Sequence, residues 1–139
     1  MARVSDEYAL KLLDQITGPL KRIEQQASKV AQTMERLEAL VEARRYFEKA
    51  ADIGHVKGMT QLAVMYRAGA GGLGKNPGLA RKWLENAAAK KYAEAMYQLG
   101  WMARNGEGMP ANEGLAKSWF EKAAALGHAG AKNMTSQMR

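Results

Sequence analysis

The sequence contains no cysteine, and among its 139 residues there are only two histidines and three prolines. Without cysteine, no disulfide can hold the fold and no thiolate can bind a metal or attack a substrate. Its apolar runs are far shorter than the roughly 20 residues that a membrane span needs, and the first residues form no apolar signal segment. We therefore expect a bacterial protein of the cytoplasm, without a membrane contact or a cofactor.

The modest share of charged residues argues against disorder, and the scarcity of histidine argues against catalysis. Charged residues make up 25% of the sequence and apolar residues 47%, which is enough to bury a core. The two histidines, His55 and His128, each follow a glycine at the same place in a repeated pattern. Recurrence with the scaffold indicates a structural or surface role, and two isolated histidines form no metal signature. We expect no enzyme.

Charge is distributed unevenly along the chain. Residues 1–52 carry nine basic and nine acidic side chains, whereas residues 53–139 carry twelve basic and five acidic ones. The whole net charge of +7 therefore belongs to the second segment. This asymmetry indicates two differently built parts, which we delimit as an N-terminal arm (1–42) and a repeat region (43–139).

The second part is internally repetitive. Segments 46–51, 83–88 and 119–124 align at spacings of 37 and 36 residues, and each holds two bulky apolar residues followed by a pair of alanines. A second set aligns at the same period and includes Met59/Met96, Leu62/Leu99, Gly69/Gly106, Gly71/Gly108 and Asn76/Asn112. A period of this length is typical of stacked helical units.

Each unit reads as two helices joined by a glycine-containing loop. The first helix carries apolar or small residues four apart and ends at Gly69 or Gly106, where a left-handed C-cap is expected. The second begins after Asn76 or Asn112, both good N-caps. Its predicted buried stripe comprises Leu79/Ala80, Trp83/Leu84 and Ala87/Ala88, with the equivalents Leu115/Ala116, Trp119/Phe120 and Ala123/Ala124.

These residues resemble the Sel-one-like repeat, a relative of the tetratricopeptide repeat, over about residues 43–132. The resemblance implies a right-handed, all-α solenoid with two complete units and a half-unit at each end, acting as a protein-binding adaptor or scaffold. Two departures from the family pattern are Ala103, where tyrosine is usual, and Lys91, where glycine is usual.

The N-terminal arm carries a different pattern. Apolar residues alternate in steps of four and three from Ala9 to Val41, which predicts a coiled-coil seam. Gly18-Pro19 interrupts this pattern, so the helix is expected to kink or stop there. Two structures fit: helix 5–17 folds back on a helix from about 20 to 52, or a kinked long helix pairs with a second subunit. The seam can also cover the open end of the solenoid in the same chain.

Oligomerisation of the arm is our preferred use of this seam, in a possible homodimer. The residues that we expect to carry it are Leu20, Ile23, Val30, Met34 and Leu37.

A glycine-rich segment, residues 69–74, matches G-x-G-x-x-G. That motif binds a pyrophosphate only between a strand and a helix N-terminus. Here a helix precedes it and no strand is predicted, so we interpret it as an inter-helix loop.

The resemblance implies that the first helix of each unit lines a concave binding surface. Trp101 is the outlier there, because it lies outside the repeat pattern and its equivalent is Val64. Tryptophan, tyrosine and arginine are enriched at protein interfaces. We expect an acidic protein or peptide to bind the predicted partner-binding residues, which are Val64, Arg67, Tyr97, Gln98, Trp101 and Arg104. The competing interpretation is that Trp101 packs against the N-terminal helices or the last half-unit.

Two other function classes fit the same composition. One is a cytosolic immunity or anti-defence inhibitor that blocks an acidic effector protein. The other is a basic nucleic-acid-binding module, which is disfavoured because the repeats hold only the short basic pairs Arg81-Lys82 and Lys90-Lys91 and no recognised nucleic-acid motif.

Overall fold

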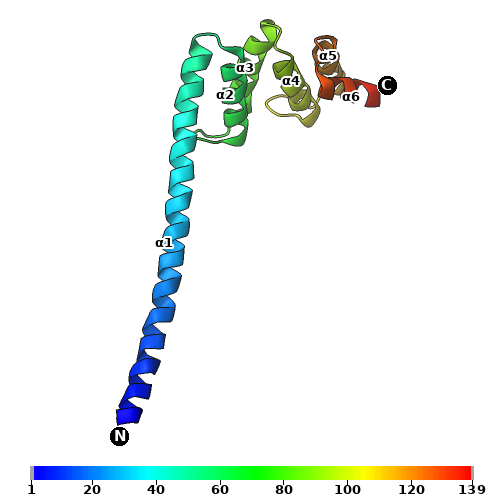
Figure 1. The fold of residues 1–139 in the computed structure, drawn as a ribbon. Coiled ribbons are helices and arrows are strands. Elements are labelled where there is room, and N and C mark those ends of the chain that lie inside the picture. The colour runs from blue at the N-terminus through cyan, green and yellow to red at the C-terminus, as the bar shows by residue number, and fades with distance from the viewer. Residues whose placement is uncertain (1, 139) are drawn as a thin grey trace. The chain divides into compact units, whose positions relative to one another are not determined.

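The computed structural model describes residues 2–138, which form six helices and no strand (Figure 1). The predicted all-α fold is confirmed. The helices are α1 (Ala2–Asp52), α2 (Val56–Ala68), α3 (Pro77–Ala89), α4 (Ala93–Asn105), α5 (Glu113–Ala125) and α6 (Ala129–Gln137). No helix in this described range is both long and apolar enough to span a membrane.

The chain divides into two units, residues 1–38 and residues 39–139. The described residues of the first unit form a single helix, the N-terminal part of α1, and α1 continues through Pro19. A helix that stops at Gly18-Pro19 is therefore wrong, and so is the alternative in which residues 5–17 fold back. Proline has a backbone φ that suits a helix, so the cost at Pro19 is one missing N–H donor and local crowding, which a long helix can absorb.

The second unit is built from helix pairs, α2 with α3 and α4 with α5, followed by α6. The predicted caps delimit these helices. Gly69 and Gly106 adopt left-handed φ angles of 70° and 71° and close α2 and α4. The Asn76 side chain accepts a hydrogen bond from the Leu79 N–H, and Asn112 does the same at Leu115, each at 3.0 Å. The repeated signals in the sequence thus produce repeated helix boundaries.

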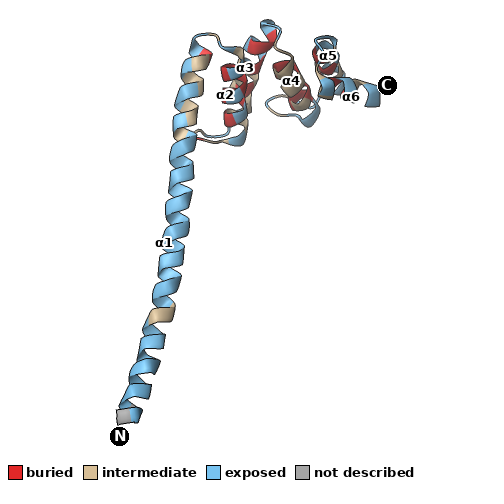
Figure 2. Cartoon of the chain, viewed as in Figure 1, coloured by how far each residue is buried: buried red, intermediate tan, exposed pale blue. Residues whose placement is uncertain are grey.

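The core of this unit is formed by small and bulky side chains that recur with the repeat (Figure 2). Ala80, Leu84 and Ala87 are fully buried, and so are their equivalents Ala116, Phe120 and Ala123. The predicted stripe is too wide at its edges, because Leu115 is exposed and Trp83 is only half-buried. The helices approach closely at Gly100 in α4, where an added Cβ would lie 2.6 Å from the Phe120 ring.

The inter-helix loops contact the preceding repeat. Gly71 has a φ of 67°, and a Cβ there would lie 2.8 Å from the Leu40 carbonyl oxygen. Its equivalent Gly108 has a φ of 70° and stands equally close to the backbone of Pro77. The G-x-G pattern is therefore explained by backbone packing between successive repeats.

The last helix, α6, differs from the other first helices in one respect. Its positions equivalent to the apolar residues Met96, Leu99 and Gly100 of α4 hold Lys132, Thr135 and Ser136. Ala131 and Met134 on the opposite side are buried against the preceding repeat. A polar outer face of this kind is characteristic of a helix that caps a solenoid.

Candidate protein-interaction surface

The predicted partner-binding residues lie on α2 and α4. Val64 and Arg104 are exposed, whereas Arg67, Tyr97, Gln98 and Trp101 are half-buried. The structure divides them into two groups with different surroundings. Arg67 and Gln98 belong to a polar network, and Tyr97, Trp101 and Arg104 belong to an aromatic cluster.

The polar network is centred on Arg67. Its guanidinium donates two hydrogen bonds to the Glu107 carboxylate, at 2.7 and 2.8 Å, and a third to the Gln98 side-chain oxygen at 2.7 Å. The hydrogen bond from Arg67 holds the pKa of the Glu107 carboxyl below its ordinary value, although burial acts in the opposite direction. All three guanidinium nitrogens are engaged within the chain, so Arg67 is a link between repeats.

Glu107 was not among the predicted site residues. It lies between Gly106 and Gly108, where the preceding repeat holds Ala70 between Gly69 and Gly71. The one signal in the sequence was this replacement of alanine by a charged residue in the second loop. Its partner Arg67 is 40 positions away, which no local spacing rule connects.

The network continues from Gln98 to α6. Gln98 donates to Glu94 at 2.8 Å, and the other Glu94 oxygen lies 2.7 Å from His128 Nε2. The His128 ring also stacks on Tyr97, with centroids 4.3 Å apart. These contacts tie α2, α4 and α6 together along one face.

The aromatic cluster places Trp101 between two rings and one cation. The Trp101 ring packs edge-on against Tyr97, at 6.2 Å between centroids, and against Phe120 at 5.8 Å. Arg104 lies over the Trp101 ring, with its guanidinium carbon 5.6 Å from the centroid. Its contact with Glu113 is long, at 3.9 Å. Trp101 therefore packs against a buried cluster that includes Phe120 and Met134 of the last half-unit, and it keeps part of its surface accessible.

Both histidines are helix caps. His55 Nδ1 accepts a hydrogen bond from the Gly58 N–H at 3.2 Å, and His128 Nδ1 accepts one from Ala131 at 3.1 Å. The equivalent residue between them, Tyr92, begins α4 without a side-chain cap. Within residues 2–138 there is no group of three potential metal ligands. The recurrence of histidine thus follows from helix initiation.

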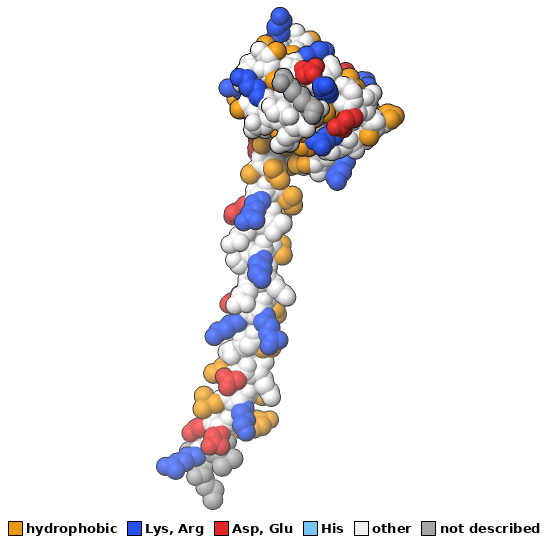
Figure 3. Space-filling view, turned by 90° about the vertical axis from the view of Figure 1, so that its right-hand side faces the viewer, with side chains coloured by type: hydrophobic (Ala, Val, Ile, Leu, Met, Phe, Trp, Pro, Cys, Tyr) orange, Lys and Arg blue, Asp and Glu red, His pale blue; other side chains and the backbone are white. Residues whose placement is uncertain are grey.

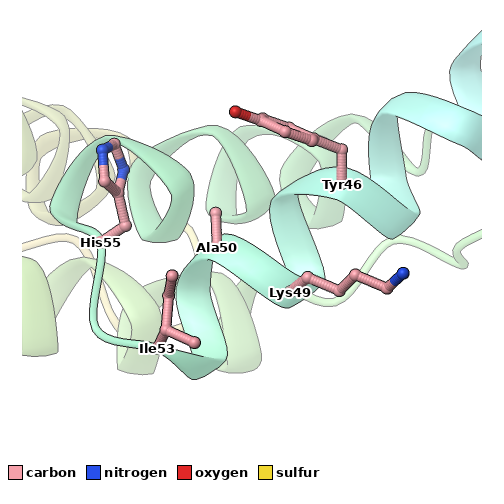
Figure 4. A pocket seen from close by; sticks show the side chains of 5 residues that line it. All are labelled: Tyr46, Lys49, Ala50, Ile53 and His55. Carbon is pink, nitrogen blue, oxygen red and sulfur yellow. The ribbon is translucent and has the colours of Figure 1, made fainter.

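A second surface lies at the end of the repeat region where the first half-unit begins. Tyr46, Lys49, Ala50, Ile53 and His55 line an open hollow of about 300 Å³ (Figure 4). Tyr46 and Ile53 are 70% and 85% exposed. The counterparts of Tyr46 in the complete units are Trp83 and Trp119, which are half-buried and packed against the core. The half-unit has no first helix before it, and that difference exposes the hollow.

The geometry defines a class of protein: an α-solenoid of paired helices in which each pair packs on the one before. The model of the Sel1 repeat matches residues 40–55, 56–92 and 93–128. These ranges cover more than half of the chain, and the protein belongs to the Sel1 repeat family. Repeats of this family are generally protein-interaction modules on a scaffold that is typically non-catalytic.

Solved structures with the same fold include several bacterial proteins. A Sel1 repeat protein from Oxalobacter formigenes is 36% identical, with a TM-score of 0.62, covering 67% of this chain and 69% of that one. A protective antigen present in uropathogenic Escherichia coli strains is 26% identical, with a TM-score of 0.66, covering 70% and 21%. Helicobacter pylori cysteine rich protein B is also 26% identical, with a TM-score of 0.60, covering 66% and 68%. A search of curated proteins finds no match.

Proposed function

We propose that this protein is an adaptor that binds an acidic protein or peptide on its repeat region and joins copies of itself through its N-terminal arm. The binding face comprises the aromatic cluster of Tyr97, Trp101 and Arg104, flanked by Val64, Arg67 and Gln98. Arm and repeats, residues 1–42 and 43–139, then have separate tasks.

The pairing of Trp101 with Arg104 is the observation that carries the binding proposal. A partly accessible tryptophan beneath a guanidinium offers both apolar area and a cation, and these residue types dominate binding energy at protein interfaces. Arg104 has only a long contact with Glu113, so its guanidinium is available to a partner carboxylate. Each nitrogen of the Arg67 guanidinium is hydrogen-bonded to Glu107 or Gln98, and its role is to hold the binding face in shape.

Charge supports an acidic partner. The full excess of +7 lies in residues 53–139, and surface charge of one sign steers and selects partners of the other sign. Basic side chains are dispersed over the visible face of the repeats with acidic ones among them (Figure 3), rather than gathered in one broad stripe. A dispersed distribution favours a protein partner over a nucleic-acid backbone, which is best matched by a continuous basic track.

The joining of copies rests on the exposed seam. Leu20, Ile23, Val30, Met34 and Leu37 are each at least half exposed on α1. Contiguous apolar surface of this kind marks an interaction site. Light scattering should report more than one chain per particle at micromolar concentration, and a strict monomer contradicts this part of the proposal.

The binding test uses two charge reversals on the repeats. Partners are first captured from a bacterial lysate on the wild-type protein, identified by mass spectrometry and purified. Arg104→Glu should weaken binding of the purified partner at least tenfold, whereas Lys82→Glu, an exposed basic residue on α3, should have little effect. Trp101→Ala should weaken binding by about 2 kcal/mol, and circular dichroism checks that the helices remain. Equal binding by all variants contradicts the proposed face.

A further inference from the structure

The seam of the N-terminal arm has a definite register. The step of three residues in a heptad runs from position a to position d, and the step of four from d to the next a. Leu13, Leu20, Ala27 and Met34 therefore occupy a. The d positions hold Ala9, Ile16, Ile23, Val30 and Leu37. Two consecutive heptads thus have leucine at a and isoleucine at d.

This order is the reverse of the one that suits two strands. Two-stranded parallel coiled coils favour β-branched residues at a and leucine at d, whereas leucine at a with isoleucine at d shifts the preference to higher-order assemblies. This preference arises because the side chains at a and at d pack against the neighbouring helices at different angles, and these angles change with the number of strands. Residues 13–23 of the arm therefore disfavour a dimer.

The flanking positions agree with a wide interface. Positions e and g, which border the seam, hold only two charged residues, Glu24 and Glu38, both at e. The others are uncharged: Leu10, Leu12, Thr17, Pro19, Gln26, Ala31 and Thr33. Charges instead gather at b, c and f, where they include Asp14, Lys21, Arg22, Lys29, Glu35 and Arg36. Two-stranded coils often pair opposite charges across g and e, and the neutral g positions provide no such pair.

A shallow hollow on the surface of α1 has the right spacing to accept a side chain from a neighbouring helix. Asp6, Ala9, Leu10 and Leu13 line this hollow on the arm. Their register positions are a, d, e and the next a. Four residues with this spacing form the hole into which a knob from a neighbouring helix fits. The hollow exists because Ala9 is small between Leu10 and Leu13, which are 61% and 55% exposed.

We infer that four copies of this chain assemble through their N-terminal arms into a parallel four-stranded coiled coil, with an apolar seam at positions a and d that is widened by the mostly uncharged positions e and g. The inference rests on the proposed joining of copies and adds its number and direction. Apolar side chains recur along the arm in Figure 3, interspersed with basic and acidic ones. An amphipathic helix of this length gains most of its stability from packing, and identical arms provide that partner.

Sedimentation equilibrium of the full chain measures the number of copies. The expected mass is four times the 15.2 kDa of one chain. Exchanging the seam residues, with Leu13→Ile, Leu20→Ile, Ile16→Leu and Ile23→Leu together, should reduce the assembly to a dimer while helical content stays unchanged. Ile16→Asn with Ile23→Asn should give a monomer. The matched control Lys21→Gln, on the charged side of the arm, should leave the mass unchanged.

The outcomes separate the two proposals. A wild-type dimer or trimer overturns the tetramer and leaves the joining of copies standing, whereas a wild-type monomer overturns both. Direction is read from a spin label on Lys11→Cys, which is the sole cysteine in that variant because the natural sequence has none. Parallel arms give short distances between all labels. Label pairs separated by most of the arm's length overturn the parallel order.

Discussion

Arg67 holds both carboxylate oxygens of Glu107, at 2.7 and 2.8 Å, across 40 positions of sequence. The two residues come from α2 and from the loop after α4, so the pair joins successive repeats. Both side chains are less than a third exposed, which limits screening by solvent. The pair therefore contributes to stability and depends on pH.

Glu107→Gln should lower the free energy of unfolding at pH 7 by about 1 kcal/mol, because a charge-assisted pair becomes a weaker hydrogen bond. The pKa of Glu107 is lowered in the folded state, so its contribution is present above the ordinary value of 4.5 and lost as the pH falls below it. Urea unfolding at pH 7 and pH 3 should therefore show the difference from wild type shrinking in acid. The control Glu121→Gln, whose exposed pair with Lys117 is 4.0 Å long, should change little. A difference that is the same at both pH values contradicts this role.

His55→Ala should destabilise the repeat region by about 1 kcal/mol, because the Gly58 N–H at the start of α2 loses its acceptor. Asparagine caps helices well, so His55→Asn should retain most of the stability. Thermal unfolding of the two variants separates a capping role from any other. Equal losses in both would show that the imidazole, and not the cap, is needed.

Gly100→Ala should cost about 1–3 kcal/mol, because the new Cβ would lie 2.6 Å from the Phe120 ring in a closely packed contact. The matched control is Gly114→Ala in the first turn of α5, where the added Cβ would meet Asn112 Oδ1 at an ordinary contact distance of 3.5 Å. Alanine has a higher helix propensity than glycine, so this control should keep or slightly raise the stability. Circular dichroism melting checks both signs, and a stabilised Gly100→Ala variant would refute the close contact.

Lys91→Gly should stabilise the protein by about 1 kcal/mol. Lys91 has a φ of 62°, and in the described part of the chain it is alone among non-glycine residues in having a positive φ. Its equivalents Gly54 and Gly127 adopt φ angles of 85° and 91° without that cost. Lys90→Gly is the contrasting control, because Lys90 has a φ of −87° and donates a hydrogen bond to the Gly54 carbonyl at 2.8 Å. Urea midpoints should rise for Lys91→Gly and fall for Lys90→Gly.

Much of the fold followed from local chemistry. The helix boundaries at Gly69, Gly106, Asn76 and Asn112 depend on caps that each act within a few residues, so the sequence carries them directly. The break at Pro19 was wrong for a related reason. A local rule gives the cost of proline in a helix but cannot weigh it against the helix on either side.

The candidate site was harder to predict, because its contacts are long-range. Trp101 stood out against the repeat pattern, and Arg104 over its ring is a local contact within α4, whereas its neighbour Phe120 follows from how α4 meets α5. Arg67 was predicted to bind a partner, and its pairing with Glu107 depends on packing between repeats. A residue that departs from the repeat pattern marks a candidate functional position. The contacts of that residue become known only from the packing of the repeats.

The polar face of α6 has a further consequence for assembly. A stack of identical units could in principle grow without limit if each end matched the other, giving fibres instead of closed particles. Lys132, Thr135 and Ser136 remove that match, since burying them against the exposed Tyr46 and Ile53 would strip water from polar groups without replacing their hydrogen bonds. End-to-end stacking of the repeats through these two faces is thereby disfavoured.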